Sequence, residues 1–382
     1  MSYSGRLETM SFDGYQNQTS EMTNKPINVI FMSHWFDNPY KRLLISNLEN
    51  YNVKVEEYPN RIFFISQVLK KGKPQILHLQ TLHRFFVSNN KIYSWLKFTV
   101  FIIQLLILKL IKVETVFTVH EWQDKLCDGK HDITPLQALI IGQCLSGIVT
   151  HCPSTKEMIT EAMNLKNPDK VFVVPHGNYI GVYENQISRS EARKSLNISS
   201  DDFVFLLFGG IHKGKGTFDG IEAFQKIANN HTRLVIAGLA STKVLKEEVL
   251  TAVKGWENIS FVGADHGIPD DEIQLYMNAS DCVVLPYKIF TTSGVTILAM
   301  SYSKACIAPK LGFFDDILDE KGAFFYVHNN NESLAKAMSL SLEKKGDFLL
   351  DMGKYNYEKA KQWDWNSIAE KTYDVYQYCL KT

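Results

Sequence analysis

The sequence predicts an α/β protein of two domains, each built on a parallel sheet with helices on both faces. Two observations predict this class. The chain has 382 residues, 45% of them apolar and 21% charged, which indicates a globular protein long enough for two domains. Short apolar runs of strand type also alternate with helical patterns along both halves, and such alternation is typical of parallel sheets.

The first half contains four strand-like runs. They cover residues 27–32, 53–55, 75–79 and 115–120. A helical pattern of apolar residues follows the first run through Leu43, Leu44, Ile45 and Leu48. Because sequential strands joined by helices pair in parallel, we expect these runs to form one sheet.

The second half repeats the design. Strand-like runs cover residues 203–208, 234–237, 259–262 and 282–285, and helical patterns cover residues 218–227 and 270–277. A second, Rossmann-like sheet follows from this alternation.

Composition places the domain boundaries. Residues 1–26 are polar, lack the apolar core of a secretory signal and are expected to form a disordered leader. We expect a first domain over 27–185, a linker at about 180–200 and a second domain over 200–362. The aromatic-rich segment 363–382 is expected to form a helix that returns to the first domain.

The charge balance limits the partners. The 41 basic and 41 acidic side chains argue against a nucleic-acid binder that works through bulk electrostatics. The six cysteines contain no CxxC pair and are expected to be reduced, buried thiols of a cytosolic protein. No group of histidines has the spacing of a metal site, so no metal is expected.

Two small-residue turns predict an anion site. One is Gly-Gly-Ile-His-Lys-Gly-Lys-Gly at 209–216, directly after a strand, and the other is Ser293-Gly294, directly before a helical run. Backbone N–H groups at a helix N-terminus have no intrahelical partner and bind anions. Two such turns in one half of the chain indicate a diphosphate held between them, and therefore a nucleotide-activated substrate.

Three segments carry a family resemblance. FLLFGGIHKGKGTFDGIEAF, FVGADHGIPDDEIQLYMNASDCVVLPY and TTSGVTILAMSYSKACIAP resemble the donor-binding domain of GT-B glycosyltransferases of family 4, also called group 1. The resemblance covers residues 27–380 and is strongest over 203–312. It implies two Rossmann-like domains with parallel sheets facing a central cleft. It also implies a nucleoside-diphosphate sugar donor, retention of anomeric configuration, and no metal or other cofactor.

The resemblance assigns roles in the donor half. Lys215 and His212 would stabilise the departing diphosphate. The donor-binding positions would be Gly209, Gly210, Lys215, Gly216, Ser293, Gly294 and Val295. Many relatives carry a pair of Glu residues here, the second of which binds the donor ribose. This chain has Phe290 and Leu298 instead, as in a "Ser-Gly" subgroup, and Asp316, beside Asp315, is a candidate ribose contact.

The first domain supplies the acceptor side in this interpretation. His120 ends a strand in FTVHEWQDK, as a histidine does in the family, and is the candidate catalytic residue beside the sugar. Glu121 and Asp124 follow it and could act as a base if the reaction inverts. The candidate acceptor-binding residues are His34, Trp35, Asp37, Asn38 and Tyr40 after the first strand, and His83 and Arg84, with His78, after the third.

The run 91–112 has two interpretations. It is almost wholly apolar from Trp95 to Ile111, and its polar residues fall on one arc of about 140°. It could be a buried crossover helix, or an apolar face with basic edges at Lys97 and Lys109 that rests on a membrane, and the two are partly compatible. Lys97 and Lys109 interrupt the run, which argues against a membrane-spanning helix.

The function expected from these features is sugar transfer from a nucleoside-diphosphate sugar to a membrane-associated or lipid-linked saccharide, as in polysaccharide or glycolipid assembly. We expect the protein in the cytoplasm, at the inner face of the cell membrane. Two alternatives stay open. One is a nucleotide-sugar-binding protein without transfer activity, and the other is an enzyme of the same architecture with another reaction, such as a phosphorylase or an epimerase.

Overall fold

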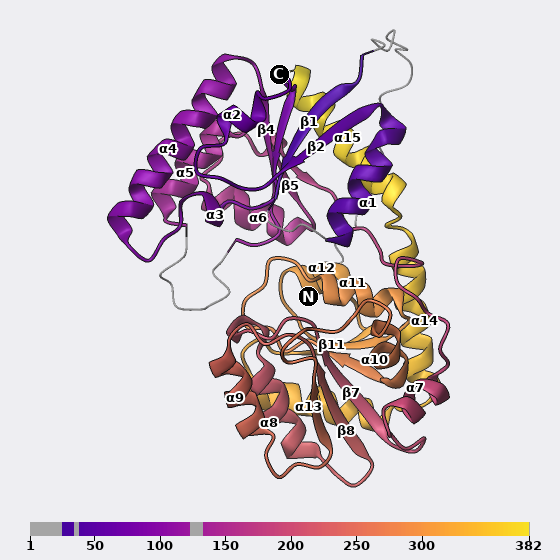
Figure 1. The fold of residues 1–382 in the computed structure, drawn as a ribbon. Helices are drawn as coiled ribbons and strands as arrows, with labels where there is room; N and C mark the ends of the chain where they lie inside the picture. Colours follow the sequence, from indigo (N-terminus) through magenta and orange to yellow (C-terminus); the bar gives the residue numbers. More distant parts are fainter. Residues whose placement is uncertain (1–24, 34–37, 123–132, 382) are drawn as a thin grey trace, which may run out of the picture.

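The chain folds into two α/β domains that lie one above the other (Figure 1). The structure, a computed structural model, describes residues 25–33, 38–122 and 133–381. Each domain has a six-stranded sheet whose paired strands all run in parallel. The predicted fold class is confirmed.

The first domain carries the sheet β2-β1-β3-β4-β5-β6. Its strands are β1 (Ile27–Met32), β2 (Val53–Tyr58), β3 (Ile76–Leu79), β4 (Glu114–Thr118), β5 (Gly147–Thr150) and β6 (Val171–Val173). Its helices are α1 (Pro39–Leu48), α2 (Ile65–Val68), α3 (His83–Phe86), α4 (Lys91–Leu110), α5 (Pro135–Cys144) and α6 (Pro153–Ala162). The central strands β3, β4 and β5 are buried along nearly their whole length, because helices cover both faces of the sheet.

The second domain carries the sheet β12-β11-β10-β7-β8-β9. Its strands are β7 (Phe203–Phe208), β8 (Thr232–Ala237), β9 (Ile259–Val262), β10 (Cys282–Val284), β11 (Ala305–Pro309) and β12 (Ala323–Tyr326). Its helices are α7 (Arg189–Ser195), α8 (Thr217–Ile227), α9 (Lys243–Ala252), α10 (Ile273–Ala279), α11 (Gly294–Ser301), α12 (Phe313–Ile317), α13 (Asn331–Glu343) and α14 (Asp347–Lys361).

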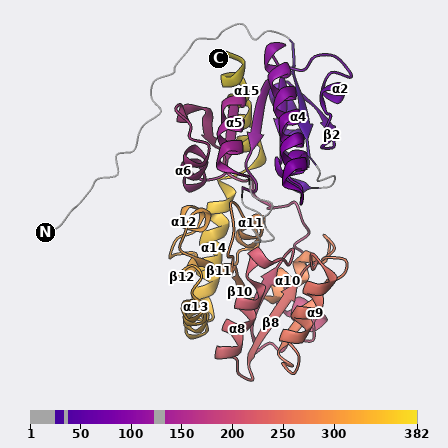
Figure 2. The same cartoon turned by 90° about the vertical axis from the view of Figure 1, so that its left-hand side faces the viewer.

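The C-terminal helix α15 (Trp365–Lys381) returns to the first domain, as predicted (Figures 1 and 2). It packs along α1 and against β4 and β5. At the crossing, the Trp365 indole N–H donates to the Asn178 carbonyl at 2.7 Å. Gly177 lies under the same ring, where a Cβ atom would come within 2.5 Å of it. The two connections between the domains are therefore packed directly on each other.

The expected linker contains regular structure. Within residues 180–200, α7 begins at a capping box in which Ser188 and Glu191 satisfy each other's backbone N–H groups. The Arg193 guanidinium is buried and pairs with Asp281 at 2.7 Å. The polar residues of this segment cap a helix and anchor it to the second domain.

His78 is a core residue, contrary to its predicted place beside the acceptor. It lies inside β3, fully buried. Its Nδ1 lies 2.7 Å from the Tyr376 hydroxyl and its Nε2 lies 2.7 Å from the Thr118 hydroxyl. Both ring nitrogens are therefore used to join β3 to β4 and to α15.

Candidate active site

The two predicted anion turns lie against each other. The turn after β7 is held under the loop after β10 because the N–H groups of Lys288 and Ile289 both donate to the Gly214 carbonyl, at 2.9 and 3.1 Å. Gly216 ends this turn in the left-handed region with φ +64°, and a Cβ atom there would lie 1.8 Å from the Pro286 carbonyl oxygen. Only glycine allows this approach, so the sequence at 216 sets the distance between the turns.

The second turn forms the N-terminus of α11. The Ser293 hydroxyl caps the helix by accepting from the Thr296 N–H at 3.2 Å, and it donates to the Tyr287 hydroxyl at 3.2 Å. The Val295 side chain lies 3.0 Å from where a Cβ of Gly209 would be, which brings the start of α11 next to the end of β7. The positive end of the α11 dipole therefore opens at the junction of both turns.

Lys215 supplies a positive charge at this junction. Its ammonium lies over the Tyr287 ring, 3.5 Å from the ring centroid. A cation in this position is attracted by the negative face of the ring. Tyr287 is buried and its hydroxyl is held by Ser293, so the ring is a fixed platform for the lysine.

These groups line a cavity of about 300 Å³ between the domains. The second domain contributes the residues just described, and the first domain contributes the ends of its strands and the start of α1. The lining residues are Asn38, Tyr40, His120, Glu121, His176, Tyr179, His212, Lys215, Tyr287, Ile289, Phe290, Thr291, Thr292, Ser293 and Gly294. The carboxyl ends of parallel strands are where open α/β sheets bind their ligands, and both sheets meet this cavity at that edge.

A chain of histidines supports the first-domain wall. His151 Nδ1 donates to the Val174 carbonyl at 2.9 Å, and His151 Nε2 lies 3.3 Å from Nδ1 of His120. His120 Nε2 lies 2.8 Å from Oε1 of Gln80, an amide oxygen that accepts from it. The contacts with His151 and Gln80 fix the ring orientation of His120.

The Tyr40 ring packs against the rings of His120, His151 and His176. It lies edge-on to His120 at 4.7 Å between centroids, and its centroid lies 5.5 Å from His151 and 4.9 Å from His176. Burial lowers the pKa of His151 to about 4 and that of His176 to about 3. Burial also raises the pKa of Tyr40. These groups are therefore neutral at physiological pH.

The buried histidines predict that the protein loses stability in mild acid. Burial lowers the pKa of His78 to about 3 as well. Histidines titrate near pH 6.5 when unfolded, so below about pH 6.5 the unfolded state binds more protons than the folded state. Each of the three then removes about 1.4 kcal/mol of unfolding free energy per pH unit, until pH reaches its folded pKa. We expect the melting temperature to fall steadily from pH 7 to pH 5, with a shallower slope in His151→Gln. A flat profile in wild type would contradict the buried, neutral histidines.

Two hydrogen bonds of Thr291 connect the loop after β10 to the first domain. The Thr291 hydroxyl accepts from the Trp122 N–H at 3.0 Å, and the Thr291 carbonyl accepts from the Thr155 hydroxyl at 3.1 Å. Asp316, on α12, also connects the two domains, because its carboxylate accepts from the Ser154 N–H at 2.8 Å. Asp316 was predicted as a ribose contact. The structure places it outside the cavity lining, where its carboxylate binds the N-terminus of α6.

The structure gathers only part of the predicted set. Asn38, Tyr40, His120, His212, Lys215, Ser293 and Gly294 share the cavity. His83 and Arg84 lie on α3, which packs on α4, and do not line it. Lys97 and Lys109 lie on α4. The predicted residues His34, Trp35 and Asp37, and Asp124, lie outside the described residues.

Sequence reasoning missed Tyr287 and Tyr179, which line the cavity, and His151, which contacts the lining residue His120. Tyr287 follows β10 and His151 follows β5, so each stands at the carboxyl end of a parallel strand. That position singled out His120 and could have singled out these two. His176 follows β6 by three residues, as Tyr287 follows β10, whereas Tyr179 carries no such signal because it lies further along the irregular crossing segment.

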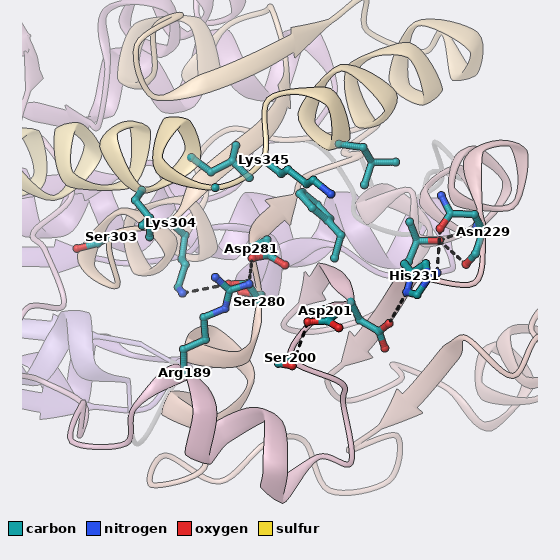
Figure 3. Close-up of a pocket in the computed structure, with 17 residues that line it drawn as sticks. Arg189, Ser200, Asp201, Asn229, His231, Ser280, Asp281, Ser303, Lys304 and Lys345 are labelled. Carbon is teal, nitrogen blue, oxygen red and sulfur yellow. Dashed lines mark hydrogen bonds and ion pairs between the residues drawn. The ribbon is translucent and has the colours of Figure 1, made fainter.

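A larger cavity of about 710 Å³ lies elsewhere in the second domain (Figure 3). Asp202, Asp281 and Lys304, which line it, directly precede β7, β10 and β11, so it stands at the amino ends of the strands. Two of these charged groups already have partners. Asp281 binds Arg189 at 2.5 Å, and the Lys304 ammonium donates to the Ser280 carbonyl at 3.1 Å. Position and pairing both make it a poor site for a diphosphate despite its size.

Solved structures share this architecture. Sucrose-phosphate synthase from Thermosynechococcus elongatus superposes with a TM-score of 0.73 at 15% identity, covering 92% of this chain and 98% of that chain. HepE of Anabaena, solved with UDP, gives a TM-score of 0.71 at 15% identity, covering 91% and 98%. The catalytic domain of starch synthase IV from Arabidopsis thaliana, bound to ADP and acarbose, gives 0.68 at 12% identity, covering 94% and 100%. The fold is the two-domain GT-B fold of sugar-transferring enzymes.

The second domain gives the family. Residues 188–359 match the family described as glycosyl transferases group 1. No curated protein sequence matches the chain. The protein is a glycosyltransferase with the GT-B fold, and its second domain is a group 1 glycosyltransferase domain.

Proposed function

We propose that the protein transfers a sugar from a nucleoside-diphosphate sugar, bound between the two turns, to a saccharide acceptor in the interdomain cavity. The observation that carries this proposal is the junction itself. A lysine ammonium and the N-terminus of α11 meet at one point, on the cavity wall supplied by the group 1 domain. A diphosphate, with about two negative charges, is the ligand that such a pair of positive groups favours.

The same groups would stabilise the leaving diphosphate. As the bond from the sugar carbon to the phosphate oxygen breaks, negative charge grows on that oxygen. Lys215, His212 and the backbone N–H groups of the α11 N-terminus would bind it. Such donors do not require a divalent cation, so we propose a metal-independent reaction. Transfer that continues undiminished in excess EDTA supports this part, and activity restored only by Mg²⁺ or Mn²⁺ would overturn it.

Retention by front-face attack fits this arrangement. The acceptor hydroxyl would form its bond to the sugar carbon on the face that the diphosphate leaves, and its proton would pass to a diphosphate oxygen. His120, Asn38 and Tyr40 would border the sugar from the first domain. NMR of the first-formed product distinguishes retention from inversion. An inverted product would assign the base role to Glu121, which is the one carboxylate among the described lining residues.

The two positions where relatives carry a carboxylate, Phe290 and Leu298, are apolar here, and the nearby Thr292 offers a hydroxyl at the cavity. The ring of Phe290 lines the cavity and packs on Phe314, with centroids 4.7 Å apart, and Leu298 is buried. The Thr292 hydroxyl is buried at the cavity without a hydrogen-bond partner among the described residues. Since buried hydroxyl groups in proteins normally form a hydrogen bond, we propose that the Thr292 hydroxyl binds a hydroxyl group of the donor.

The acceptor in this proposal is a saccharide carried by a lipid, reached from the cytoplasmic face of the cell membrane. Its support is the apolar exposed side of α4, a surface suited to contact with lipid.

A donor screen tests the proposed function. We expect one class of UDP-, GDP- or ADP-sugar to raise the melting temperature of wild type, because a ligand of the folded state stabilises it by mass action. Transfer is then measured with that donor. A donor that binds but is neither transferred nor hydrolysed would indicate a binding protein. Conversion of the donor without acceptor would indicate an epimerase, and a requirement for inorganic phosphate would indicate a phosphorylase.

A further inference from the structure

The helix α4 exposes an apolar side, while the side that packs on the domain carries the polar Gln104. Six residues on one arc of about 100° face outward. They are Ile92, Leu96, Ile103, Leu106, Ile107 and Leu110, here called the α4 face, and their exposed fractions run from 39% for Ile107 to 83% for Leu110. The predicted polar arc instead coincides with the packed side, where Phe98, Phe101, Leu105 and Leu108 are buried with Gln104.

Polar contacts lock this orientation. The Gln104 side chain accepts from the N–H groups of Phe64 and Ile65 at 2.8 and 3.1 Å, and donates to the Ile62 carbonyl at 2.7 Å. The Ser94 hydroxyl donates to the Phe86 carbonyl at 2.8 Å. Rotating the helix to bury the α4 face would break these bonds and leave buried polar groups unsatisfied. The exposed apolar face is therefore a fixed feature of the fold.

Neighbouring elements extend the apolar surface. Leu136 on α5, which packs beside α4, is 56% exposed, and Phe63, next to the Gln104 contact, is 70% exposed. Trp95 and Tyr93 flank the α4 face near its start and are 39% and 50% exposed. Tryptophan and tyrosine side chains favour the boundary between lipid and water. Figure 1 shows α4 on the outside of the first domain, at its edge.

The segment that carries this surface has charges of one sign. Residues 58–113 contain nine Lys and Arg and no Asp or Glu, although the whole chain is balanced at 41 of each. Lys91 and Lys109 border the α4 face, and the Lys97 ammonium rests over the Tyr93 ring, 4.4 Å from its centroid. A basic rim around an apolar surface is complementary to anionic lipid headgroups over acyl chains.

Within the part of the chain that the structure describes, α4 is also the one helix long and apolar enough to cross a bilayer. It does not fit that role here, because five of its residues pack into the first-domain core against α3, α5 and β4.

We propose that the α4 face docks the first domain flat on an anionic lipid bilayer, with its leucines and isoleucines in the headgroup and acyl boundary and its lysines at the phosphates. The inference deepens the proposed function, because it names the surface through which the enzyme would reach a lipid-carried acceptor. The docking itself needs neither donor nor acceptor, so it is tested separately from catalysis.

Vesicle flotation tests the proposal. We expect wild type to float with phosphatidylcholine vesicles that contain phosphatidylglycerol, and less with phosphatidylcholine alone. Lys97→Gln/Lys109→Gln should lower the partition coefficient by about 30-fold on anionic vesicles, at about 5-fold per lysine. Leu106→Gln/Leu110→Gln should lower it by more than 10-fold on either vesicle. Val244→Gln/Leu350→Gln, at exposed apolar positions of the second domain, is the matched control and should float as wild type does.

Several results would overturn the docking. One is failure of wild type to float with anionic vesicles, and another is flotation of Leu106→Gln/Leu110→Gln at the wild-type level. A concentration-dependent dimer in light scattering that Leu106→Gln/Leu110→Gln dissolves, without flotation, would assign the surface to a second copy of the chain. The donor-induced melting shift, measured without vesicles, reports on the proposed function alone. Loss of one readout with the other intact identifies which of the two fails.

Discussion

Replacing Lys215 with alanine is expected to lower the turnover number of sugar transfer by a factor of about 10² or more. The ammonium over the Tyr287 ring is a fixed positive charge in the cavity lining, at the junction of the two turns. A positioned charge at a departing diphosphate contributes that much, because it acts where negative charge develops. Initial rates at saturating donor measure the effect, and the melting temperature reports whether the variant is folded.

The neighbouring lysine is the control. Lys213 lies two residues away in the same turn, but it is exposed and does not line the cavity. Lys213→Ala should retain turnover within a few-fold of wild type. If Lys215→Ala also transferred sugar at the wild-type rate, the diphosphate would have to be bound elsewhere.

Replacing Gly216 with alanine is expected to disrupt both the fold and the donor site. The new Cβ would lie 1.8 Å from the Pro286 carbonyl oxygen, so the loop after β10 must move away from the turn after β7. The left-handed φ of +64° adds about 1 kcal/mol of strain for any residue with a side chain. We expect a loss of several kcal/mol in unfolding free energy. Donor affinity should fall with it, because the two turns then no longer meet.

Gly255→Ala separates the two causes. Gly255 has φ +84° and nothing within 4 Å of the added Cβ, so this variant experiences the backbone strain alone. Denaturant titration should show a loss of about 1 kcal/mol for Gly255→Ala and a clearly larger loss for Gly216→Ala. Equal losses would mean that the loop after β10 yields without cost, and that Gly216 does not fix the junction.

The fold was predictable because its signals are local. The apolar run at residues 203–208 matches β7, since a strand buried on both faces must be apolar throughout. The turn at 209–216 was also readable, because glycine at a left-handed position and at a close approach leaves a direct mark on the sequence.

The site was harder to predict because it depends on pairings between distant segments. The sequence around Asp316 does not indicate that its carboxylate accepts from the Ser154 N–H. The sequence around His78 likewise does not indicate that its ring nitrogens contact Thr118 and Tyr376. The Tyr287 platform under Lys215 joins residues 72 positions apart. The periodicity of α4 distinguishes a polar and an apolar side, but it does not tell which side faces the core. The polar side can face the core because Gln104 forms hydrogen bonds with backbone groups of residues 62–65.

A crystal structure of the protein with the nucleoside diphosphate that gives the largest melting shift tests the central claim most directly. The account predicts the diphosphate between Lys215 and the N-terminus of α11, with its oxygens within hydrogen-bond distance of the Lys215 ammonium and of N–H groups at 294 and 295. A diphosphate bound instead in the cavity of Arg189, Asp281 and Lys304, or bound between the domains without contact to Lys215, would contradict it.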